Sequence, residues 1–155
     1  MLIDTETVET SAIEFLEDGY HKLVITKCEF VTDENEGFKV EWQEETGKRK
    51  CFSNLYYSVS GDPTWAKFSR DSLRDLLWVF KIKGLETAEQ AQKLSQWLIS
   101  KTCIVKTKQR VYESNGERKT TVNTVSFYNE DGLNRSGMKA KLLDAPQAPK
   151  GDVPW

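Results

Sequence analysis

Residues 102–128, TCIVKTKQRVYESNGERKTTVNTVSFY, contain the pattern that decides the fold. Asn115-Gly116 is typical of a tight two-residue β-turn, because both residue types tolerate the positive φ angles that such a turn requires. β-branched and aromatic residues dominate on both sides of this dipeptide, as they do in strands. The stretch therefore predicts a long antiparallel β-hairpin.

The first strand of this hairpin has two chemically different sides. Side chains alternate along a strand, so one side of IVKTKQRVY carries Lys106, Lys108, Arg110 and Tyr112, whereas the other carries Val105, Thr107, Gln109 and Val111. Arg118, Lys119, Thr121 and Asn123 follow across the turn. Cations can track phosphates while aromatic rings stack on bases, which predicts a nucleic-acid-binding face. The alternative is a solvated face whose lysines keep an edge strand soluble.

The N-terminal half predicts a three-stranded antiparallel meander. Residues 18–31, 38–45 and 49–59 are rich in β-branched and aromatic residues, and the polar turns TDENEG and TGK separate them. In the second of these strands Phe38, Val40 and Trp42 share one side. Trp42 is expected in the core, and stacking on a base is the alternative.

Two helices are predicted between the third and fourth strands. Asp62 and Ser69 are candidate starts of the first helix and Gly84 is its candidate stop. The motif TAEQ at residues 87–90 matches a capping box at the start of the second. Both helices have apolar stripes at helical spacing, which predicts that they pack on the core: Leu73, Leu76, Leu77 and Phe80 in the first, and Ala91, Leu94, Trp97 and Leu98 in the second.

Three strands, a helical insertion and a hairpin are the element order of an OB-fold, a five-stranded Greek-key barrel that often binds single-stranded nucleic acid. We therefore expect a mainly β domain over residues 17–128, with an acidic leader at 1–16 and a flexible tail at 129–155. A β-sandwich or an open α+β sheet could use the same order of elements.

A second basic and aromatic stretch accompanies the third strand. Lys48, Arg49 and Lys50 lie in or beside the preceding turn, and Phe52 and Tyr56 share one side of the strand. These residues extend the predicted DNA-binding surface.

Composition narrows the class of protein. Residues 1–18 carry six acidic and no basic side chains, so the rest of the chain has four more basic than acidic residues, which favours a polyanionic partner. Three cysteines without a C-x-x-C pair and a single histidine favour a reducing cytoplasm and neither a structural metal nor a disulfide scaffold. The sequence has no apolar run that could span a membrane, and none of the common catalytic or cofactor-binding motifs. We therefore expect a cytoplasmic protein that is not an enzyme and binds no cofactor.

Three stretches resemble phage-encoded single-stranded-DNA-binding proteins with an OB-fold. They are DGYHKLVITKCEF in the first strand, RDSLRDLLWVFKIKG in the first helix and WLISKTCIVKTKQ from the second helix into the basic strand. The resemblance covers about residues 16–128. It implies a sequence-nonspecific protein that coats single-stranded DNA during phage replication or recombination.

The sequence GDVPW at residues 151–155 is similar to the acidic tips ending in Pro-Phe through which single-stranded-DNA-binding proteins recruit replication and recombination proteins. The resemblance implies a partner-binding tip made of Asp152, Val153, Pro154 and Trp155, although the side chains of residues 129–155 sum to zero charge. A small metal-dependent nuclease and a pure protein-interaction module remain alternatives. The oligomeric state stays open, a homo-oligomer included.

Overall fold

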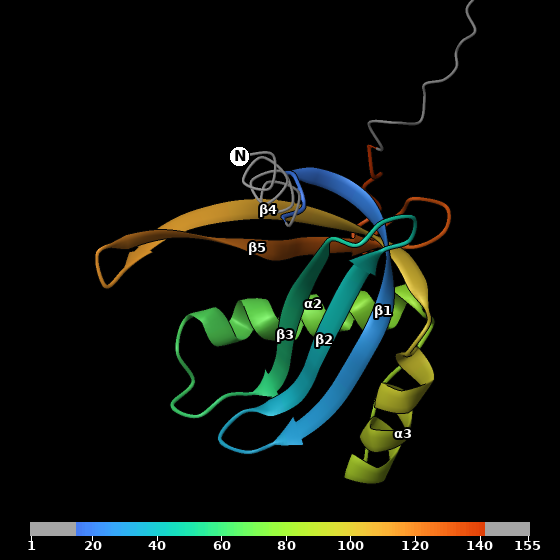
Figure 1. Cartoon of the computed structure of the whole chain (residues 1–155). Helices are drawn as coiled ribbons and strands as arrows, with labels where there is room; N and C mark the ends of the chain where they lie inside the picture. Colours follow the sequence, from blue (N-terminus) through green and yellow to red (C-terminus); the bar gives the residue numbers. More distant parts are fainter. Residues whose placement is uncertain (1–14, 142–155) are drawn as a thin grey trace, which may run out of the picture.

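The computed structural model of the chain describes residues 15–141 (Figure 1). Five antiparallel strands form one sheet in the order β3-β2-β1-β4-β5. The strands are β1 (Gly19–Thr32), β2 (Glu36–Glu44), β3 (Lys50–Ser58), β4 (Thr102–Ser114) and β5 (Glu117–Tyr128). Helices α2 (Trp65–Val79) and α3 (Ala88–Leu98) lie between β3 and β4, as the sequence predicts.

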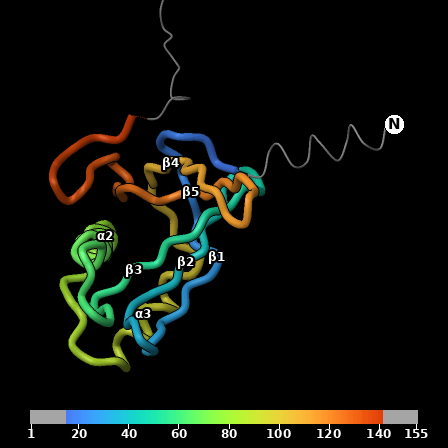
Figure 2. Tube along the Cα trace, turned by 90° about the vertical axis from the view of Figure 1, so that its left-hand side faces the viewer, coloured from blue at the N-terminus to red at the C-terminus, as the bar shows by residue number. Residues whose placement is uncertain are grey.

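β1 belongs to two differently oriented parts of the sheet. Its residues 19–24 pair with β4, whereas residues 23–32 pair with β2. A bulge at Thr26 shifts the register between these parts, and bulges of this kind bend a strand. Figures 1 and 2 show the result, with β4 and β5 crossing one end of the β1-β2-β3 part.

The core fills the concave side of this bent sheet. Trp42 is fully buried there and stacks on Phe127 with 5.7 Å between ring centroids. Both helices close the same side with Leu73, Leu76, Leu94 and Leu98 (Figure 2). Trp97, predicted as a core residue, is instead 48% exposed and packs edge-on against Phe80.

The two edges of the sheet approach each other without forming a ladder. β3 and β5 are not paired through their main chains in residues 15–141, so the predicted closed barrel is not seen. Instead, the hydroxyls of Ser53 and Thr124 share a hydrogen bond of 2.7 Å, and Trp42 Nε1 donates to Ser53 Oγ at 2.9 Å. Side chains alone therefore bridge the seam between the edges.

The helix boundaries differ from those predicted. α2 begins at Trp65, and neither Asp62 nor Ser69 caps it. Ser69 lies inside the helix, where its hydroxyl accepts a hydrogen bond from Tyr56 N at 2.7 Å. α2 ends at Val79, before Gly84, because Lys81 adopts a φ of 62°. That left-handed residue lets Ile82 N donate to Leu77 O at 2.8 Å, a Schellman-type helix end.

The folded domain extends beyond its predicted limits at both ends. Leu16, placed in the leader, is fully buried in the core. Residues 129–141, placed in the tail, form turns and a β-bridge between Leu133 and Lys139, and Arg135 Nε donates to Asp75 Oδ1 at 2.6 Å. Asparagine side chains account for these turns, because Asn129 and Asn134 each accept from two main-chain amides.

Candidate nucleic-acid interface

The outer part of the β4-β5 hairpin projects from the rest of the sheet (Figure 1). β1 pairs with β4 only as far as Thr107, whereas the β4-β5 ladder continues to Ser114 and Glu117. We call residues 108–123 the arm. Asn115 and Gly116 at its tip both have positive φ, as the predicted two-residue turn requires.

One side of the arm collects the predicted cations. Residues directly opposite in an antiparallel ladder share a face, and the register pairs Lys108 with Asn123, Arg110 with Thr121 and Tyr112 with Lys119. We call these six residues together with Lys106 the basic face. Tyr112 is 40% exposed, and Lys108, Arg110 and Lys119 are exposed. Within residues 15–141, none of the basic-face cations forms an ion pair.

Tyr20 adds an aromatic ring at the base of this face. It lies opposite Lys106 in the β1-β4 register, and Lys106 Nζ is 5.5 Å from the centroid of its ring. The ring of Tyr20 also packs edge-on against Tyr128 at 5.4 Å. Tyr20 could not be predicted as part of this face, because only the β1-β4 register, which a single sequence does not reveal, brings it beside the hairpin.

Arg118 does not belong to the basic face. The ladder pairs it with Glu113, and both lie on the other side of the hairpin, on which Val111 is 52% exposed. One acidic residue, Glu117, shares the side of Lys119, near the tip. The hairpin thus has four cations and one carboxylate on this side, and Asp18 adds a second carboxylate at the edge of β4, where it accepts from Gln109 N at 2.6 Å.

The basic turn before β3 is largely neutralised by neighbouring carboxylates. Arg49 Nε donates to Glu44 Oε1 at 2.9 Å, and this hydrogen bond raises the pKa of Arg49 and lowers that of Glu44. Lys50 Nζ lies 3.6 Å from Glu41 Oε2. Of the three predicted cations, Lys48 alone forms no ion pair within residues 15–141.

A surface around the exposed ring of Phe52 lies on the outer side of β1, β2 and β3, and we call it the Phe52 platform. Phe52 is 62% exposed beside a shallow groove of about 590 Å³, which Lys27, Lys39 and Asn54 also line. Glu41 lies in the same groove with 9% exposure. A 2.7 Å hydrogen bond from Thr26 Oγ1 is the main cause that holds the Glu41 pKa below its usual value. Glu29 also lines the groove, so two carboxylates accompany the two lysines of the platform.

The other predicted aromatic residues are engaged inside the protein. Trp42 is fully buried, so its ring is not accessible to a base, in agreement with the preferred core assignment. Tyr56 is partly buried and packs edge-on against Trp65 at 6.3 Å. Phe52 and Tyr112 are therefore the predicted rings most accessible to a ligand.

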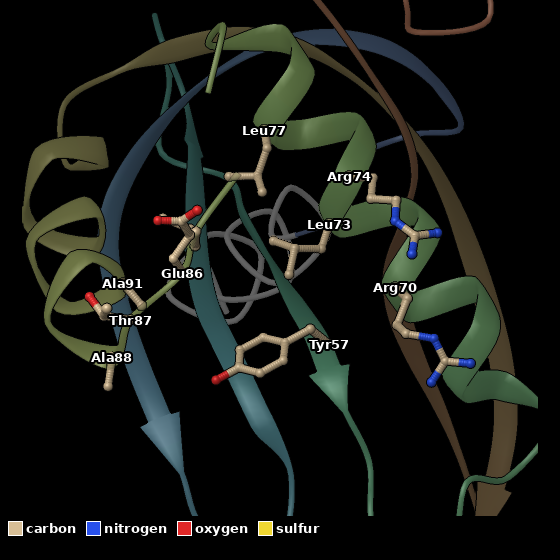
Figure 3. Close-up of a pocket in the computed structure, with 10 residues that line it drawn as sticks. Tyr57, Arg70, Leu73, Arg74, Leu77, Glu86, Thr87, Ala88 and Ala91 are labelled. Carbon is tan, nitrogen blue, oxygen red and sulfur yellow. The ribbon is translucent and has the colours of Figure 1, made fainter. Parts of the chain in front are cut away.

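A separate cleft lies between α2, β3 and the start of α3 (Figure 3). Its volume is about 350 Å³, and Leu73, Leu77 and Ala91 provide apolar lining. Tyr57, Arg70 and Arg74 line it from β3 and α2 (Figure 3). The cleft could not be predicted from the sequence, because the chain segments that form it are adjacent only in the folded protein.

The described residues offer little for other site chemistry. Within 15–141, no group of three or more His, Cys, Asp or Glu residues could hold a metal ion. The cysteines are free thiols, and burial raises the pKa of Cys28 and Cys51 to about 12 and also raises that of Cys103. No described helix is long and apolar enough to cross a membrane.

No protein-family model and no curated protein matches the chain. The predicted tip, Asp152 to Trp155, lies outside the described residues. The basic face and the Phe52 platform together offer cations for phosphates and accessible rings for bases, which is the combination that single-stranded nucleic acids require.

Proposed function

We propose that this protein binds single-stranded DNA without sequence preference and serves DNA replication or recombination, as its resemblance to phage proteins implies. The observation that carries the proposal is the basic face, whose four cations form no ion pair among residues 15–141. Three of them lie between Tyr20 and Tyr112, and the fourth, Lys119, lies opposite Tyr112. Cations in this arrangement can follow a phosphate backbone while exposed rings accept bases.

We further propose that the bent sheet is an OB-fold whose barrel is partly open. Joining β3 to β5 would close the observed strand order into a ring, and the Ser53–Thr124 hydrogen bond already brings these edges together. OB-folds bind oligonucleotides with the face of the second and third strands and with the loop between the fourth and fifth. In this chain those elements carry Phe52 and the arm.

A fluorescence titration with a thymidine oligomer, with and without magnesium, tests the proposal. We expect tighter binding to the oligomer than to a duplex, a steep loss of affinity with salt and no cleavage of the oligomer when magnesium is present. Replacing Tyr112 or Phe52 with Ala should each weaken binding by about 1–3 kcal/mol if the ring stacks on a base. Equal affinity for duplex, or no binding at low salt, would contradict the proposal, and cleavage with magnesium would favour the nuclease alternative.

A second candidate function, as a protein-interaction module, is favoured by the cleft in Figure 3. Its apolar lining would suit a peptide that carries an apolar anchor next to a carboxylate. That carboxylate would have to replace Asp62 and Asp71, which lie 3.3 and 3.2 Å from Arg70 and Arg74. Reversing the charge of both arginines should then abolish capture of partners while leaving DNA binding intact. Loss of DNA binding in that variant would instead place the cleft in the DNA path.

A further inference from the structure

A second hollow lies at the C-terminal end of α2, next to the cleft of Figure 3. Its volume is about 760 Å³, and its apolar lining comes from Leu77, Val79 and Ile82. Trp78 also lines it and is 39% exposed. We call this hollow the α2-end groove. An accessible Trp on an apolar floor is typical of the central residues of protein-binding surfaces.

The charges along the α2-end groove are of one sign. Among residues 15–141, the charged side chains that line it are all basic: Arg74, Lys81, Lys83 and Arg135. The two arginines already contact carboxylates, because Arg74 lies 3.2 Å from Asp71 and Arg135 lies 2.6 Å from Asp75. Lys81 and Lys83 are exposed and form no ion pair within the same residues. The groove is therefore complementary in charge to an acidic ligand.

Neither lysine is required to complete the end of α2. The carbonyls of residues 76–78 each accept a hydrogen bond from a main-chain amide. Acidic side chains do approach Lys81, because Glu130 and Asp131 line a smaller hollow that shares this lysine. Lys83 does not line that hollow, which leaves its charge to the α2-end groove.

The α2-end groove and the cleft adjoin each other along α2. They share Arg74 and Leu77, which lie about one turn apart on the helix (Figure 3). Leu73 and Ala91 add apolar surface on the side of the cleft, and Trp78 does so on the side of the groove. One extended ligand can therefore contact two apolar sites with cations along its path.

We propose that the cleft and the α2-end groove together bind an acidic peptide of a partner protein, with one apolar anchor in the cleft and a second on Trp78. Carboxylates of this peptide pair with Lys81 and Lys83. The aliphatic floor favours a peptide over a nucleic acid, because bases stack on aromatic rings and Trp78 is the one ring among residues 15–141 that lines the groove. This inference rests on the second candidate function, as a protein-interaction module, and does not depend on DNA binding.

The probe is a synthetic fluorescein-labelled peptide of alternating Asp and Leu, whose binding to the full chain is followed by anisotropy. In an extended peptide this alternation places the Leu side chains on one side and the carboxylates on the other. The variant Lys81→Asn with Lys83→Gln should bind the peptide roughly 2- to 30-fold more weakly at low salt, because two exposed ion pairs are lost. Asn is chosen at Lys81 because it tolerates the φ of 62° at this position. Trp78→Ala should weaken binding at least about fivefold.

The matched control is Lys67→Gln with Lys93→Gln. It removes the same charge from exposed lysines that line neither hollow, and it should bind the peptide like the unmodified chain. Peptides with Ser in place of Leu, or with Lys in place of Asp, should bind far more weakly. Equal binding by the control and the lysine variant of the groove, or equal binding of the Ser and Leu peptides, would overturn the proposal. Weaker binding of a thymidine oligomer by the lysine variant would assign the groove to nucleic acid and overturn it as well.

The variant Arg70→Gln separates this inference from the function on which it rests. Arg70 lines the cleft and not the α2-end groove, so a peptide that occupies both hollows should bind more weakly to this variant and to the lysine variant. If Arg70→Gln weakens binding and the lysine variant does not, the function of the cleft stands and the inference fails. If the peptide does not bind, or if no variant changes its affinity, both fail.

Discussion

Removing three cations from the arm should change the salt dependence of DNA binding by a calculable amount. Lys108, Arg110 and Lys119 are exposed, and none of them forms an ion pair within residues 15–141. Each cation that neutralises one phosphate contributes about 0.7 to the slope of log K against log salt on a single strand, so replacing all three with Ala should lower the slope by about 2. Because the electrostatic contribution vanishes near 1 M salt, this slope corresponds to roughly 100-fold weaker binding at 0.1 M.

The assay is fluorescence anisotropy of a labelled thymidine oligomer between about 0.05 and 0.4 M salt. The matched control replaces Lys67, Lys83 and Lys93, three exposed lysines in or near the helices, with Ala. It removes the same net charge and should lose little affinity. An unchanged slope in the arm variant, or an equal loss in the control, would refute the reasoning, because binding would then depend on net charge or on another surface.

Three further predictions concern the core and the turns. Gly37→Ala should destabilise the fold by roughly 1–3 kcal/mol, because a Cβ at this position would lie 2.2 Å from Leu55 O and 2.5 Å from Tyr56 Cα. An unchanged midpoint of urea unfolding would contradict the close approach of β2 and β3. Trp42→Phe should lower the free energy of unfolding by roughly 2–3 kcal/mol, because it loses packing and the hydrogen bond to Ser53. The affinity for the oligomer should stay unchanged, and weaker binding by a folded variant would show that Trp42 contacts DNA. The lowered pKa of Glu44 means that its contribution to stability is present above its unfolded pKa of about 4.3 and is lost as the pH falls through the folded pKa. Glu44→Gln should therefore flatten the acid side of the stability curve, and an unaltered acid transition would show that the Arg49 pair is not the cause.

The elements of the fold could be predicted because each depends on local chemistry. Asn115-Gly116 determines a turn by its φ angles, and Thr87 determines a helix start by accepting from Gln90 N at 3.1 Å. The end of α2 could not be predicted, because Lys81 rather than a glycine takes the left-handed conformation there. The seam between β3 and β5 was also out of reach, since Ser53 and Thr124 are 71 residues apart in the chain.

The candidate site shows the same division between local and long-range information. Strand alternation placed Lys106, Lys108, Arg110 and Tyr112 on one side, and the β4-β5 register is consistent with that assignment. Arg118 and Lys119 are consecutive, so only one of them could share that side, and the register decides in favour of Lys119. The carboxylates that pair with Arg49 and Lys50 could not be assigned from the sequence, because these pairs depend on which of many acidic residues the β2-β3 hairpin brings near.

The arrangement of the arm separates binding from folding. Among residues 108–123, Val122 is the one member of the buried core, so substitutions on the basic face leave the packing around Trp42 untouched. Changing the charge of the arm should thus alter DNA affinity at little cost to the stability of the domain.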